Sequence, residues 1–205
     1  MFDLGFFSKI FQSNGGSSFY QLYTKMIKWK ESKVFPFPYN LPNSISFPSE
    51  FWKDVISIYK ETDVDGLERA ISVFWADGEL IVTSIVKGNE SSVTSNHNLS
   101  IKYSPTTKRE YLKKEVILNG KTIKKKDVYY KKAPKKISVE YLFNMHTHPA
   151  HILPEDGVKR YSFFSLQDIN SLLNSNAIIT GLVTDKLWLL RSEEHTSELQ
   201  SRQVI

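Results

Sequence analysis

The chain has 205 residues, of which 40% are hydrophobic and 13% aromatic, enough for one domain with a sizeable core. It contains no cysteine, which excludes disulfide bonds and thiol chemistry and leaves His, Asp and Glu as the possible metal ligands. The net charge of +5 indicates a basic surface that suits acidic partners.

The N-terminal part begins with MFDLGFFSKIF, which lacks the basic-then-apolar order of a signal peptide. No stretch of the chain approaches the roughly 18 apolar residues of a membrane-spanning helix, so we expect a cytoplasmic protein with no membrane span. Residues 19–33 follow a Gly-Gly-Ser-Ser breaker and predict a helix. Four prolines in 34–48 then predict an extended connector, because proline disrupts helices and central strands.

The middle of the chain predicts a helix and two hairpins. Ser49 is expected to cap a helix over 50–61. Two β-rich runs follow, joined by the hairpin signal Ala76-Asp77-Gly78. A polar segment that includes 98–103 separates them from a second hairpin, which turns at Asn119-Gly120.

The last part of the chain predicts strands around one helix. The run 137–148, ISVEYLFNMHTH, is apolar and rich in β-branched and aromatic residues, which predicts a largely buried strand. Residues 165–175 predict a short amphipathic helix, and 177–183 and 186–190 predict a closing pair of strands. Helices and strands in this order favour an α/β or α+β domain built on a sheet.

Residues 121–136 hold eight lysines interleaved with Tyr129 and Tyr130. We interpret this run as the solvated edge of a hairpin, where lysines keep the strand from pairing with other chains. A nucleic-acid surface and a docking surface for an acidic protein are the alternatives. Nucleic acid is therefore not expected as a partner.

The tail 191–201, RSEEHTSELQS, resembles the in-frame translation of a sequencing adapter, and 202–205 continue the same frame. We therefore expect 191–205 to be foreign to the natural protein, and exclude His195 and the nearby glutamates from any site. The natural C-terminus would then be missing, and the domain could continue past Leu190. The alternative is a charged, solvated terminal helix.

Two histidines end the predicted strand of 137–148. Side chains alternate between the faces of a strand, so His146 and His148 project together and can bind one ion. Imidazole nitrogen suits Zn²⁺, and Pro149 ends the strand, which leaves the pair at an open rim. A surface pair without a metal is the alternative.

Ser165 and Asp168 open the predicted helix of 165–175, and their spacing is typical of a capping box. A metal site is compatible with the cap, because a preceding loop can fold the first turn of a helix over the end of a strand. Two His and one Asp would fill three tetrahedral positions and leave the fourth for water, as in a catalytic zinc site.

A catalytic zinc site also needs a carboxylate that takes a proton without binding the metal. Glu68 is the candidate, since it begins a β-rich run just after a helix and would be costly to bury without a purpose. A surface carboxylate at a strand edge is the alternative. Glu61, Glu79 and Glu90 are less well placed, because each lies at a helix end or in a turn.

Together, Glu68, His146-Thr147-His148-Pro149 and Ser165-x-x-Asp168 resemble the motif of the JAB/MPN (JAMM) metalloprotease family. That motif is an upstream Glu, then His-x-His-Pro, a loop and Ser-x-x-Asp. The resemblance covers roughly 48–190 and leaves 1–47 as an N-terminal extension with a proline-rich connector. It implies a cytidine-deaminase-like, JAMM-type fold, in which a curved mixed sheet is flanked by helices.

The resemblance also implies a role for each motif residue. His146, His148 and Asp168 would bind Zn²⁺, Glu68 would be the general base and then the acid, and Ser165 would stabilise the tetrahedral oxyanion. The implied activity is hydrolysis of a peptide or isopeptide bond, with the C-terminus of a ubiquitin-like or sulfur-carrier-like protein as the substrate. A non-catalytic MPN scaffold that only binds proteins is the alternative.

The segment between Pro149 and Ser165 is about twice as long as is usual in the family, and a surface insertion of this kind costs little entropy. His151 is expected to be a loop residue and not a fourth ligand, and Asp156, a rival third ligand, lacks the helix context of Asp168. The loop residues expected beside the scissile bond are Leu153, Pro154, Glu155, Asp156 and Arg160.

We predict that shortening the loop from Ala150 to Phe164 changes which substrate is cleaved, because this loop borders the expected scissile bond. Zinc should stay bound, since none of the expected ligands lies in the loop. Metal analysis and cleavage of a panel of ubiquitin-like fusions measure the two properties. Loss of zinc from the shortened protein would contradict the prediction.

Overall fold

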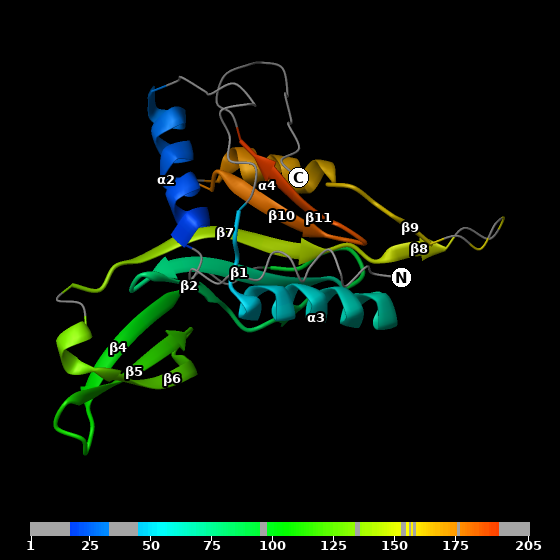
Figure 1. Ribbon diagram of the computed structural model, residues 1–205. Helices are drawn as coiled ribbons and strands as arrows, with labels where there is room; N and C mark the ends of the chain where they lie inside the picture. The colour runs from blue at the N-terminus through cyan, green and yellow to red at the C-terminus, as the bar shows by residue number, and fades with distance from the viewer. Residues whose placement is uncertain are drawn as a thin grey trace.

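The computed structural model describes residues 17–32, 45–94, 98–133, 136–152, 155, 157, 159–175 and 177–192. These residues form three α-helices, a six-stranded mixed sheet, a three-stranded antiparallel sheet and a two-stranded hairpin (Figure 1). Of the two classes that the order of elements predicted, α/β and α+β, the structure has the α+β class. None of the described helices is long and apolar enough to cross a membrane.

The elements have the following bounds. The helices are α2 (Ser17–Ser32), α3 (Ser49–Asp65) and α4 (Leu166–Asn174), with a 3-10 turn, η2, at Tyr130–Lys132. The strands of the main sheet are β1 (Arg69–Ala76), β2 (Glu79–Val82), β3 (Val86–Lys87), β7 (Val139–Thr147), β10 (Ile179–Val183) and β11 (Leu187–Arg191). The small sheet contains β4 (Leu99–Pro105), β5 (Tyr111–Leu118) and β6 (Lys121–Tyr129), and the hairpin contains β8 (Ala150–Ile152) and β9 (Lys159–Tyr161).

The main sheet has the strand order β11-β10-β7-β1-β2, and β3 also pairs with β1. Its central strand, β7, is parallel to β10 and antiparallel to β1. His146 lies opposite Ala70 of β1 on one side and Leu182 of β10 on the other. The buried strand predicted over 137–148 is confirmed, and its continuous apolar sequence fits a strand that is covered on both faces.

Helices α2 and α3 cover one face of the main sheet and share one core. Phe19 of α2 packs on Phe47 and on Phe143 of β7, with ring centroids 4.9 and 5.2 Å apart. Phe51 of α3 stacks on the same Phe47 at 4.2 Å. The N-terminal helix therefore packs in the same core as α3 and the sheet.

Helix α4 covers the opposite face, where Leu172 packs with Leu182 of β10 and Leu190 of β11. Ile179 and Val183 of β10 belong instead to the core under α2 and α3. Because neighbouring residues of a strand point to opposite faces, this division places the three helices on two sides of the sheet.

The small sheet is joined to the β1–β2 hairpin by a buried ion cluster. Lys114 of β5, whose side chain is 1% exposed, contacts the carboxylates of Asp77 and Glu79, the latter at 2.9 Å. Tyr103 Oη donates to Asp77 Oδ2 at 2.5 Å, and Lys126 Nζ contacts Glu79 at 2.9 Å. A buried ammonium group is costly unless carboxylates compensate it, so this cluster fixes where the two sheets meet.

The lysine-rich run lies mainly on β6, an edge strand of the small sheet, as predicted. Like Lys126, two other lysines of this run form ion pairs with acidic side chains. Lys124 pairs with Glu50 of α3 at 2.8 Å, and Lys125 pairs with Glu115 of β5 at 3.1 Å. These carboxylates neutralise part of the positive charge, which counts against the alternative of a nucleic-acid surface.

Both predicted hairpin turns are confirmed. Asp77 and Gly78 have φ angles of 57° and 76°, and Asn119 and Gly120 have 48° and 77°, the positive values that a two-residue type I′ turn requires.

The prediction that Ser49 caps α3 is wrong. Pro48 occupies the N-cap with φ −59° and ψ 152°, and Ser49 is the first residue inside the helix. The extended backbone of Pro48 already has the non-helical conformation of an N-cap, so the helix begins one residue earlier than the serine signal indicated. No side-chain cap is present at this end.

Two segments form strands that the sequence did not indicate. β4 lies in the polar segment, and its Leu99 and Ile101 pack with Val116 and Leu118 of β5. β8 and β9 pair within the segment predicted as a loop. Some of the segments and residues for which the sequence made a prediction lie outside the described residues. These are 1–16, 33–44, 193–205, Leu153, Pro154, Asp156 and the side chain of Arg160.

Replacing Lys114 by Met is expected to lower the free energy of unfolding by about 3 kcal/mol, because Asp77 and Glu79 lose a buried counter-ion. Lys125→Met is the matched control, since the Lys125 side chain is 60% exposed and an exposed pair contributes at most about 1 kcal/mol. Urea denaturation measures both values. Equal stability of the two variants would contradict the role given to Lys114.

Candidate metal site

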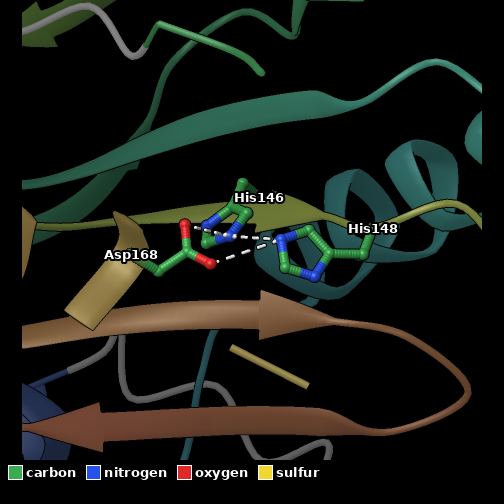
Figure 2. Close-up of side chains that lie close together, drawn as sticks. All are labelled: His146, His148 and Asp168. Atoms are coloured by element: carbon green, nitrogen blue, oxygen red, sulfur yellow. Dashed lines mark hydrogen bonds and ion pairs between the residues drawn. The ribbon is translucent and has the colours of Figure 1, made fainter. Parts of the chain in front are cut away.

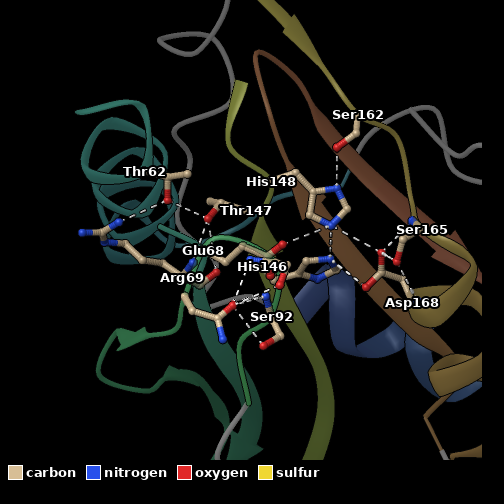
Figure 3. A network of polar contacts seen from close by, with 12 residues as sticks. Thr62, Glu68, Arg69, Ser92, His146, Thr147, His148, Ser162, Ser165 and Asp168 are labelled. Atoms are coloured by element: carbon tan, nitrogen blue, oxygen red, sulfur yellow. Dashed lines mark hydrogen bonds and ion pairs between the residues drawn. The ribbon is translucent and has the colours of Figure 1, made fainter. Parts of the chain in front are cut away.

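Four ionisable side chains from three segments of the chain converge at one end of the main sheet (Figure 3). His146 is the second-last residue of β7, and His148 is the first residue after that strand. Glu68 immediately precedes β1. Asp168 lies in the first turn of α4. The neighbouring strands β1 and β7 bring Glu68 to the histidines, and packing of α4 on β10 brings Asp168 over the end of β7.

Three of these side chains place their ligand atoms within a few ångströms of one another (Figure 2). The two Nε2 atoms of His146 and His148 are 3.2 Å apart. Asp168 Oδ1 is 3.1 Å from Nε2 of His146, and Asp168 Oδ2 is 3.4 Å from Nε2 of His148. Both imidazoles are buried, with 6% and 8% of their surface exposed.

This arrangement fits a tetrahedral metal ion. Zinc bonds of about 2.0–2.1 Å to nitrogen and oxygen place two ligands of a tetrahedron about 3.3 Å apart. The 3.2 Å between the imidazole nitrogens and the 3.1 Å between His146 and Asp168 match that edge. Two imidazoles and one carboxylate are also ligands that zinc accepts, so His146, His148 and Asp168 could bind a metal ion.

Asp168 serves both the helix cap and the histidine cluster. Its Oδ2 accepts hydrogen bonds from the backbone N–H and the hydroxyl of Ser165, both at 2.7 Å. The hydroxyl of Ser165 in turn accepts from the backbone N–H of Asp168 at 3.2 Å, which completes the capping box. Oδ1 has no part in the cap and contacts His146. The predicted capping box is therefore confirmed and is compatible with the metal site.

Glu68 is buried, with 7% of its surface exposed, and its Oε1 lies 4.0 Å from Nε2 of His148. Its backbone is fixed on both sides, because its N–H donates to the carbonyl of Asn89 and its carbonyl accepts from the N–H of Gly88, both at 2.8 Å. The carboxylate thus lies beside the cluster of His146, His148 and Asp168 without being part of it.

The segment around Glu68 is also locked to β7 and α3 by polar contacts behind the site. Thr147, between the two histidines, accepts from the backbone N–H of Arg69 at 2.9 Å, and its Oγ1 lies 2.7 Å from Oγ1 of Thr62. The buried guanidinium of Arg69 contacts Glu61 at 2.9 Å and Asp65 at 2.7 Å on α3. These contacts fix the start of β1 against the end of β7, and with it the distance from Glu68 to the histidines.

The charges of the cluster shift its pKa values. Burial would raise the pKa of Asp168, but hydrogen bonds with His146 and His148 outweigh it and hold the pKa well below the usual range. Burial would lower the pKa of His148, but its hydrogen bond to Asp168 and the charge of Asp168 outweigh it and raise the pKa. Burial raises the pKa of Glu68, against the charges of the two histidines. Asp168 is therefore held ionised, as a ligand must be, whereas Glu68 takes up a proton more readily than an exposed carboxylate.

The other side chains considered from the sequence lie elsewhere. His151 is exposed on β8, a strand where a loop was predicted, and does not belong to the ligand cluster found among the described residues. Glu61 binds Arg69, Glu79 belongs to the Lys114 ion cluster, and Glu90 is exposed.

Sequence reasoning missed the supporting residues Thr62, Arg69, Thr147 and Ser162. For Thr147 a signal was available, because alternation along a strand places it on the face opposite His146 and His148. Nothing local indicated Ser162, whose hydroxyl lies 3.1 Å from Nδ1 of His148. Its contact depends on the return of the chain through β9.

No protein-family model, curated protein or solved structure matches the chain. The described residues show a mixed α/β fold with a buried His-His-Asp group that could bind a metal ion.

We predict that the wild-type chain retains a single zinc ion after dialysis, and that His146→Ala and Asp168→Ala retain none, because each removes one of three clustered ligands. His151→Ala is the matched control, since His151 is exposed and outside the cluster, and it should retain zinc like the wild type. Elemental analysis of the four proteins gives the stoichiometry. Retention of zinc by His146→Ala would contradict the ligand assignment.

Proposed function

We propose that this chain is a zinc-dependent hydrolase of the JAMM type, which cleaves a peptide or isopeptide bond. The observation that supports the proposal most strongly is the position of Glu68. A buried carboxylate 4.0 Å from a histidine of a His-His-Asp cluster, and outside that cluster, suits proton transfer better than structural metal binding. A site built only to hold a metal has no use for such a group.

The proposed zinc ligands are His146, His148 and Asp168. When bound, zinc supplies Lewis acidity and a water molecule whose pKa is lowered to about 7. In this proposal Glu68 accepts the proton of the attacking water and delivers it to the leaving amide nitrogen. Because burial raises the pKa of Glu68, the carboxylate holds a proton well enough to carry it between the two steps.

Ser165 has the proposed role of stabilising the oxyanion. It is exposed at the entrance of α4, beside the ligand Asp168, and its hydroxyl donates to Asp168 Oδ2 in the described state. During the reaction its O–H would turn from that carboxylate towards the carbonyl oxygen of the substrate. Its backbone N–H would continue to hold Asp168 Oδ2, at 2.7 Å, so the ligand would stay in place.

The proposed substrate is the C-terminal tail of a ubiquitin-like or sulfur-carrier-like protein. This class comes from the resemblance of the motifs to the JAB/MPN family. The fold is compatible with it, because α2 and α3 on one face and α4 on the other flank a mixed sheet, as expected for a JAMM-type domain. The β8–β9 hairpin begins two residues after His148, so it lies where it could contact the substrate.

We expect Glu68→Gln to bind zinc like the wild type but to lose about 10²- to 10⁴-fold in the rate of cleavage of a ubiquitin-like fusion, because Gln cannot transfer the proton. Glu90→Gln, at an exposed position, is the matched control and should keep full activity. Ser165→Ala should also bind zinc and lose activity to a smaller extent. Cleavage rates and zinc content are measured on the same preparations.

The outcomes of this experiment separate two functions. Equal cleavage by wild type and Glu68→Gln would remove Glu68 from its role. A wild-type chain that purifies without stoichiometric zinc and cleaves none of the fusions would instead support the non-catalytic scaffold.

A further inference from the structure

The orientation of His148 needs a support that β7 does not provide. His146 lies within β7 and is held by pairing on both sides, with Ala70 and with Leu182. His148 lies just beyond the last residue of that strand, Thr147. Its ring nevertheless points Nε2 at His146 and Asp168, at 3.2 and 3.4 Å.

The support comes from a segment that follows the β8–β9 hairpin. The hydroxyl of Ser162 lies 3.1 Å from Nδ1 of His148, on the side of the ring opposite Nε2, as Figure 3 shows. Ser162 is itself placed between two fixed neighbours. Tyr161 pairs with Ala150 in the hairpin and its Oη lies 2.7 Å from Oη of Tyr59 on α3, whereas Phe164 is buried beside α4.

The contact with Ser162 bears on which nitrogen of His148 carries the hydrogen. A neutral imidazole has one N–H, and a ligand nitrogen must be the one without it. Asp168 Oδ2, 3.4 Å from Nε2, attracts a hydrogen to Nε2, which is the wrong place for metal binding. The hydroxyl oxygen of Ser162 can accept a hydrogen bond from Nδ1–H, and the backbone of Phe163 also hydrogen-bonds to His148. With the hydrogen on Nδ1, the lone pair of Nε2 is directed at the site.

We propose that Ser162 is a positioning residue for the metal site: it holds His148 with the hydrogen on Nδ1 and with Nε2 directed at His146 and Asp168. The inference rests on the proposed metal-dependent function. It also gives the hairpin insertion a second role, because the segment that leaves β9 contributes this contact. A loop shortened to test substrate choice must therefore keep Ser162 for zinc to stay bound. Hydrogen bonds of this kind to the far nitrogen of a ligand His commonly change metal affinity by about 10- to 100-fold.

The test compares zinc affinity in four full-length proteins: the wild type, Ser162→Ala, Ser162→Thr and Ser100→Ala. Ser100 is an exposed serine on β4, so its replacement controls for loss of a hydroxyl at the surface. Competition between each protein and a chromogenic chelator gives the Kd for Zn²⁺. We expect Ser162→Ala to raise the Kd about 10- to 100-fold. Ser162→Thr keeps the hydroxyl and should restore most of the affinity, and Ser100→Ala should match the wild type.

Thermal unfolding with excess chelator distinguishes a positioning role from a folding role. The metal-free Ser162→Ala protein should unfold at the same temperature as the metal-free wild type, because the hydroxyl acts on the ring of His148 and not on the packing of the hairpin. A lower unfolding temperature together with weaker zinc binding would assign Ser162 a structural role and overturn the proposal.

Two further outcomes would also overturn it. These are a Ser162→Ala protein with the Kd of the wild type, and a Ser162→Thr protein that binds zinc as weakly as Ser162→Ala. Failure of the proposed function looks different, since the wild type itself would then bind no zinc.

Discussion

The close approach of His146, His148 and Asp168 is the constraint on which the interpretation of this fold depends. Three ionisable side chains meet with ligand atoms 3.1–3.4 Å apart in a largely buried place. Burying such groups is costly unless each has a partner. Asp168 supplies a negative charge for both imidazoles, and a divalent cation would bring all three lone pairs to one point. The carboxylate of Glu68 lies next to this cluster and outside it.

The rest of the domain holds these four side chains in position. Alternation along β7 turns His146 and His148 towards α4 and turns Thr147 towards α3, where it contacts Thr62 and the backbone of Arg69. A single tripeptide therefore supplies two candidate ligands on one face and the connection to α3 on the other. On the far side, the capping box that starts α4 also orients the carboxylate of Asp168. Local rules of secondary structure thus orient each candidate ligand, and packing of α4 on β10 brings Asp168 to the histidines.

Those local rules explain what could be predicted from the sequence. The two hairpin turns, the buried strand of the histidines and the capping box of α4 each depend on residues close in the chain, and all are present. The contacts that were missed depend on partners far apart in sequence. Lys114 is buried because Asp77 and Glu79 meet it from another sheet, and Ser162 reaches His148 only because β8 and β9 pair. A local pattern carries no information on either contact.

We propose that one metal ion is bound between β7 and α4. A crystal grown with Zn²⁺ and measured on both sides of the zinc absorption edge tests this most directly, because the anomalous difference map locates zinc independently of the protein atoms. We expect one strong peak in contact with Nε2 of His146, Nε2 of His148 and Oδ1 of Asp168, with Glu68 near the ion but not bound to it. A fully ordered site with no peak there, or a peak in contact with other side chains, would contradict this ligand assignment.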